Sequence, residues 1–144
     1  MMHFLRWPLG LLICGAVLGC GGSSLVKPKG RVLKEGAPFQ TADGEALRVI
    51  LAPADGPEGA HYDSYPALYN PDNATFQVVG KDGKGLPPGK YRVGLELIKK
   101  KEDVFKGALM GRRSPFTCEV TSSSSEIVVD LDQAKDQGKF TKTR

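Results

Sequence analysis

The sequence contains few of the residues that build metal centres and nucleophilic sites. Its 144 residues include only 2 histidines and 3 cysteines. His61 is the one histidine beyond the N-terminal segment, so few side chains are available to bind a zinc ion. The sequence also lacks the Asp-x-Asp-x-Asp spacing of a calcium loop, and the glycine-rich stretch 80–89 lacks the Gly-Lys-Ser/Thr of a phosphate loop. We therefore expect no metal and no cofactor.

Long apolar runs and dense basic stretches are also missing. The uncharged apolar run at residues 9–18 is about half as long as the roughly 20 residues that a membrane-spanning helix needs. The net charge is only +4, and no Lys/Arg stripe with interleaved aromatic residues occurs. We therefore expect neither a transmembrane helix nor a nucleic-acid partner.

Glycine and proline, in contrast, are abundant, with 18 and 10 residues. They separate short runs in which apolar and polar side chains alternate, which is the pattern of β-strands joined by turns. The seven expected strands cover residues 29–33, 47–52, 65–69, 75–79, 91–98, 117–121 and 126–131. The chain is therefore predicted to be all-β, with about seven strands in an antiparallel sandwich.

Two residues in or next to these strands carry specific expectations. Gly89 follows Pro88, and this pair predicts a type II turn in which Gly89 has a positive φ. On this basis, a side chain at Gly89 should cost more stability than one at Gly83, which we expect in a looser loop. Cys118 alternates with Val120 and should point inward, where a free thiol behaves as a small hydrophobic group.

The N-terminal segment has the features of a cleaved secretion signal. Arg6 precedes the apolar run, and the residues Val17-Leu18-Gly19-Cys20 resemble the lipobox of bacterial lipoproteins. This resemblance implies cleavage before Cys20, a diacylglycerol thioether on its thiol and a membrane anchor. Residues 1–19 would be the signal peptide, 20–28 a lipidated flexible tether, 29–131 the β-sandwich and 132–144 a polar tail that we expect to be disordered. An ordinary secretion signal with an incidental cysteine is the alternative.

The order of motifs in the domain resembles that of small bacterial lipoproteins with a transthyretin-like, carboxypeptidase-regulatory-like β-sandwich. The resemblance rests on Gly30-Arg31-Val32, on Ala74-Thr75-Phe76-Gln77-Val78 and on the stretch from Leu86 to Val93. It implies a binding or scaffolding domain at the cell membrane or outer membrane, facing the periplasm or the exterior. The transthyretin-like branch that hydrolyses 5-hydroxyisourate uses several histidines and a C-terminal Tyr-Arg-Gly-Ser. Neither feature is present in the mature part of this chain.

Two candidate sites lie near the middle of the chain. Tyr62, Tyr65 and Tyr69 could form an exposed platform that stacks on sugars or binds a protein, or they could cap the edge of the sandwich. The run from His61 to Ser64 contains the residue types of a hydrolase triad, but residues this close in sequence are held apart by the local backbone. An exposed polar loop is the better interpretation.

Three functions follow from these observations. The leading hypothesis is a non-enzymatic cell-envelope lipoprotein that is anchored through Cys20 and binds a protein or glycan partner. A structural spacer or scaffold without a specific ligand is the alternative. An envelope hydrolase that uses His61 comes third.

Overall fold

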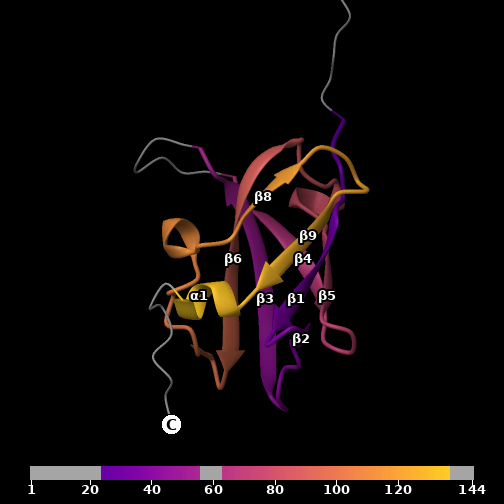
Figure 1. Ribbon diagram of the computed structural model, residues 1–144. Helices are drawn as coiled ribbons and strands as arrows, with labels where there is room; N and C mark the ends of the chain where they lie inside the picture. Colours follow the sequence, from indigo (N-terminus) through magenta and orange to yellow (C-terminus); the bar gives the residue numbers. More distant parts are fainter. Residues whose placement is uncertain (1–23, 56–62, 137–144) are drawn as a thin grey trace, which may run out of the picture.

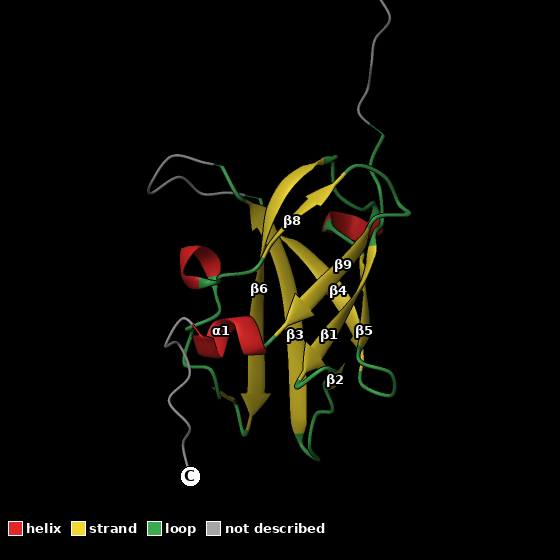
Figure 2. Cartoon of the chain, in the orientation of Figure 1, coloured by secondary structure: helices red, strands yellow, loops and turns green. Residues whose placement is uncertain are grey.

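The computed structural model describes residues 24–55 and 63–136, which form a curled β-sheet with little helix (Figures 1 and 2). The strands are β1 (Lys29–Lys34), β2 (Ala37–Pro38), β3 (Glu45–Pro53), β4 (Tyr65–Asn70), β5 (Thr75–Val78), β6 (Gly89–Lys99), β7 (Glu102–Asp103), β8 (Thr117–Val120) and β9 (Glu126–Asp130). Two 3-10 turns, η1 (Lys81–Gly83) and η2 (Gly111–Arg113), and the short helix α1 (Asp132–Asp136) complete the described part. The all-β prediction is confirmed, and each of the seven expected strands is present. The additions, β2 and β7, have two residues each.

The strands follow one another in the order β8-β6-β3-β4-β5-β1-β9, with β2 and β7 extending β1 and β6. All pairs are antiparallel except β1–β9, which is parallel and sets Gly30 opposite Ile127 and Val32 opposite Val129. This pair departs from the expected antiparallel arrangement. The chain crosses from β8, beside β6, to the opposite margin of the sheet instead of turning back as a hairpin.

One core fills the inside of the curled sheet. Alternate residues of the two longest strands point into it, as period-two patterning requires. The buried apolar residues include Val32, Leu47, Val49, Leu51, Phe76, Val78, Tyr91, Val93, Leu95, Leu97, Val120, Ile127 and Val129. Residues distant in sequence thus depend on one another for burial, and no single hairpin could form this core alone.

The domain is longer at both ends than the sequence predicted. Val26 and Pro28, assigned to the flexible tether, are buried, and Val26 pairs with Leu86. Residues 132–136, assigned to a disordered tail, form α1, in which Ala134 is completely buried. In both places the buried residues are too few to show a periodic pattern, so the sequence gives no signal of their packing on the core. Residues 137–144 lie outside the described part.

The segment between β7 and β8 covers one edge of β6 without forming a regular strand. The Val93 and Leu95 amides donate to the carbonyls of Phe116 and Leu109, each at 2.9 Å. The buried Ser114 hydroxyl donates to the Val93 carbonyl, so this irregular segment satisfies backbone groups that a neighbouring strand would otherwise satisfy.

The expected turn at Gly89 is wrong. Gly89 begins β6, its φ is not positive, and an added Cβ would make only ordinary contact with the Tyr91 ring at 3.6 Å. Positive φ occurs earlier in this region, at Gly80, Gly83 and Gly85, because the tight loop around η1 makes the reversal.

The structure therefore reverses the expected ranking of these two glycines. Gly83 has a φ of 68° with open space around it, so Gly83→Ala should lower the free energy of unfolding by about 1 kcal/mol, the cost of left-handed backbone. Gly89→Ala should cost less, because β-conformation suits alanine. Urea denaturation of both variants measures the difference. A larger loss in Gly89→Ala would contradict the backbone described here.

Candidate functional site

The structure describes two of the three tyrosines of the predicted patch. Tyr65 and Tyr69 lie on the face of β4 that packs against the core. The Tyr65 ring meets Tyr91 edge-on, with centroids 5.8 Å apart, and the Tyr69 hydroxyl donates to the Phe39 carbonyl at 2.8 Å. Both rings are thus partly buried, as expected if these tyrosines cap the edge of the sandwich. Tyr62 lies outside the described residues.

The predicted triad-like run is described only in part. His61 and Tyr62 lie outside the described residues, so their geometry is not defined. Asp63 and Ser64 are exposed, and the Asp63 carboxylate pairs with the Lys81 ammonium. This ion pair raises the pKa of Lys81. Asp63 thus has a salt-bridge partner on η1.

A hollow with a volume of about 530 Å³ lies over β4, β5, β1 and β9. Its lining includes an exposed residue from each strand, in one row across the sheet. Leu68 lies opposite Gln77, Gln77 opposite Lys29, and Lys29 opposite Glu126. Strand pairing thus brings together four side chains from residues 29–126. We call this row and the hollow beside it the cross-strand surface.

The cross-strand surface combines apolar and charged groups. Leu68 is 68% exposed, and Val128, in the neighbouring row, is 48% exposed. Between them, the Arg31 guanidinium lies 3.4 Å from the Glu126 carboxylate. Two exposed aliphatic side chains and an ion pair thus lie on one face of this part of the sheet.

Sequence reasoning missed the cross-strand surface because its residues are brought together by strand register. One signal was present in β4, where Tyr65 and Tyr69 alternate with Pro66, Leu68 and Asn70. Alternation puts these two sets on opposite faces, so turning the tyrosines inward exposes Leu68.

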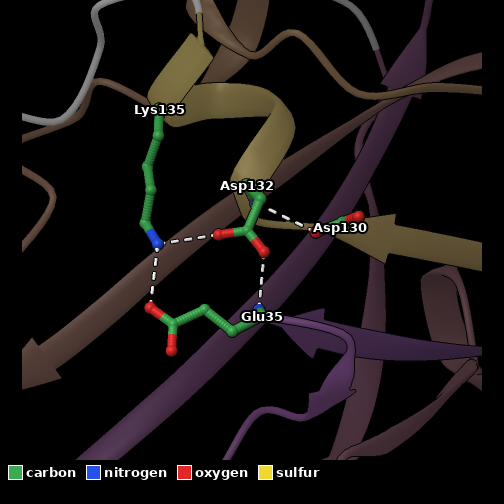
Figure 3. Close-up of polar contacts among 4 residues, drawn as sticks. All are labelled: Glu35, Asp130, Asp132 and Lys135. Carbon is green, nitrogen blue, oxygen red and sulfur yellow. Dashed lines mark hydrogen bonds and ion pairs between the residues drawn. The ribbon is translucent and has the colours of Figure 1, made fainter.

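A second cluster, formed by Glu35, Asp130, Asp132 and Lys135, fastens α1 to the turn between β1 and β2 (Figure 3). The Asp132 carboxylate accepts the Glu35 amide at 2.5 Å, and the Lys135 ammonium donates to Asp132 and Glu35 at 2.7 and 3.3 Å. The hydrogen bond from Lys135, followed by that from the Glu35 amide, lowers the pKa of Asp132. The charged groups of Asp132, Lys135 and Glu35 are therefore paired with one another, and these contacts hold α1 against the turn.

The Cys118 thiol is half-buried between core residues, as the sequence predicted, and burial raises its pKa from 9.0 to about 11. The pKa of Tyr91 rises from 10.0 to about 12, chiefly because of burial. At neutral pH both groups are protonated, and the thiol has little of the thiolate form that nucleophilic chemistry requires.

These raised pKa values predict alkaline destabilisation. Between about pH 9 and pH 11 the unfolded chain releases the Cys118 proton while the folded protein keeps it, so the free energy of unfolding should fall as pH rises. Urea midpoints measured across this range should decline. The urea midpoint of Cys118→Ala should decline less steeply with pH. The decline that remains would be due in part to ionisation of Tyr91. Equal slopes would contradict the burial of the thiol.

The described residues hold no group of three or more His, Cys, Asp or Glu side chains that could bind a metal ion. Within the same ranges, no helix is long and apolar enough to cross a membrane. No known protein family, curated protein or solved structure matches the chain.

Proposed function

We propose that this chain is a lipid-anchored cell-envelope protein and that its β-domain is a non-enzymatic module that binds a protein partner. The anchor is Cys20, and the binding site is the cross-strand surface. The observation that carries the binding proposal is the exposure of Leu68 and Val128 on the sheet face that also carries the Arg31–Glu126 pair. A glycan is the less favoured ligand, because Tyr69 and Phe76, the aromatic residues in this lining, pack toward the core.

The lipid anchor is supported by the sequence around Cys20. An arginine, a short apolar run and the residues Val17-Leu18-Gly19 precede the cysteine in the order that lipoprotein maturation requires. Two or three acyl chains would hold the protein stably, since each buried CH₂ contributes about 0.8 kcal/mol. The proposed location is the cell membrane or outer membrane, facing the periplasm or the exterior.

Replacing Cys20 by alanine tests the anchor. Wild-type protein produced in a bacterial host with labelled palmitate should incorporate the label, and Cys20→Ala should incorporate none because the acceptor thiol is gone. Cys118→Ala is the matched control and should be labelled like the wild type. Label retained in Cys20→Ala would overturn the anchor.

The binding module is tested by changing the cross-strand surface without unfolding the domain. Proteins that crosslink to the lipidated domain in intact cells are compared for wild type, Leu68→Asp and Val104→Asp. Val104 is also exposed, at 47%, but lies beside β7, away from this surface. A specific partner should be lost in Leu68→Asp and kept in Val104→Asp. The absence of any specific crosslink would favour the alternative of a structural spacer.

A further inference from the structure

The chain enters the folded domain at one well-fixed point. Val26 is buried and forms two backbone hydrogen bonds with Leu86, each 2.9 Å long. The next amide, that of Lys27, donates to the Ser123 hydroxyl at 3.2 Å. The loops that contact this segment, residues 79–86 and 122–125, each have internal hydrogen bonds. In the first loop, the Gly85 amide donates to the Val79 carbonyl at 2.7 Å. The first packed residue therefore has a defined place at one end of the domain.

This end is opposite the one at which β3 begins and β6 ends (Figure 1). β3 and β6 run between the two ends, and β6 has eleven residues. At about 3.3 Å per residue, β6 spans about 35 Å. The domain is thus elongated along these strands, with the point of chain entrance at one end.

The tether between the proposed anchor and this point is short. Six residue steps separate Cys20 from Val26, and even a fully extended chain covers only about 20 Å over that number. The tether is therefore shorter than β6. If Cys20 is held at the bilayer surface, Val26 stays within about 20 Å of that surface. The end of the domain that contains Val26 is therefore kept nearer to the bilayer than the opposite end.

We propose that the end formed by residues 24–27, 79–86 and 122–125 faces the lipid headgroups, and that the opposite end points away from the membrane. This proposal rests on the lipid anchor at Cys20. The exposed groups at this end suit a headgroup surface. Leu25, next to the tether, is 47% exposed. Two exposed lysines, Lys27 and Lys84, give this end more positive than negative charge, since Asp82 is the exposed acid and Lys81 pairs with Asp63.

Fluorescence energy transfer to the membrane measures this orientation. The full lipidated chain, in a Cys118→Ala background, receives one dye at Lys84→Cys or at Asp43→Cys. Both positions are exposed, and Asp43 lies just before β3, at the end we place away from the bilayer. The proteins are reconstituted in phosphatidylethanolamine–phosphatidylglycerol vesicles that contain a headgroup-labelled acceptor lipid. Transfer from position 84 should exceed transfer from position 43 by roughly two-fold or more, given about 30 Å of strand between them.

The outcomes separate this proposal from the proposed function. A chain that carries no lipid and does not float with vesicles shows that the anchor is wrong, before any transfer is measured. A lipidated chain with equal transfer from both positions, or with greater transfer from position 43, overturns the orientation alone. A flexible insertion after Ser23 is the control for tether length and should remove the difference, whereas a difference that survives it contradicts the role of the short tether.

Discussion

Gly30→Ala should lower the free energy of unfolding by about 3 kcal/mol or more, the cost of a severe overpacking in a core. Gly30 is buried in β1, between β5 and β9. A Cβ at this position would lie 2.2 Å from Phe76 Cζ and 2.5 Å from the Ile127 carbonyl oxygen. The ring could be displaced, but the carbonyl belongs to the neighbouring strand, so relief of the clash must disturb the parallel pair. Urea denaturation followed by circular dichroism measures the loss.

Gly36→Ala is the matched control for this prediction. Gly36 has a φ of 75° and no atom within 4 Å of an added Cβ, so alanine there should cost only about 1 kcal/mol. Combining Gly30→Ala with Phe76→Leu should recover part of the loss, because the smaller side chain leaves room for the methyl group. Equal stability of Gly30→Ala and Gly36→Ala would show that β1 does not approach Phe76 this closely.

Asp103→Ala should lower the free energy of unfolding by about 3 kcal/mol, because three backbone amides lose their hydrogen-bond acceptor. One carboxylate oxygen of Asp103 accepts the Leu97 and Phe105 amides at 3.1 and 3.0 Å, and the other accepts the Gly107 amide at 2.6 Å. The side chain therefore joins the end of β6 to the irregular segment that covers its edge. Thermal and urea denaturation of the purified domain would report the loss.

Glu102→Ala provides the comparison for Asp103. Glu102 precedes it in β7 and is exposed, so its replacement should change stability by no more than about 0.5 kcal/mol. Asp103→Asn keeps one acceptor oxygen and should fall between the two. If Asp103→Ala resembles Glu102→Ala, the three hydrogen bonds contribute nothing to folding.

The strands were predictable from sequence because alternation is a local property. In β6 the inward set Tyr91, Val93, Leu95 and Leu97 is visible without knowledge of any neighbour. The limits of the domain were not predictable, since the burial of Val26 and Ala134 depends on distant partners and shows in no local pattern. The conformation of Gly89 also depends on context, because the loop before it, with positive φ at three glycines, already reverses the chain.

The cross-strand surface shows why a binding surface is harder to predict than a strand. Leu68, Gln77, Lys29 and Glu126 come together only through three separate strand registers. Each register is set by core packing around the whole curled sheet. The alternation of polar and apolar residues within each strand does not indicate which residues of neighbouring strands lie opposite one another.

The parallel pairing of β1 with β9 has a mechanical consequence for a protein held at its N-terminus. The two strands run in the same direction, so tension between the start of β1 and the end of β9 pulls them lengthwise past each other. The five paired positions from Lys29–Glu126 to Leu33–Asp130 then share the load and must yield together, whereas a hairpin pulled apart at its open end loses one pair at a time. A force applied between the first and last strands of the domain would therefore be resisted by all five paired positions of β1 and β9 at once.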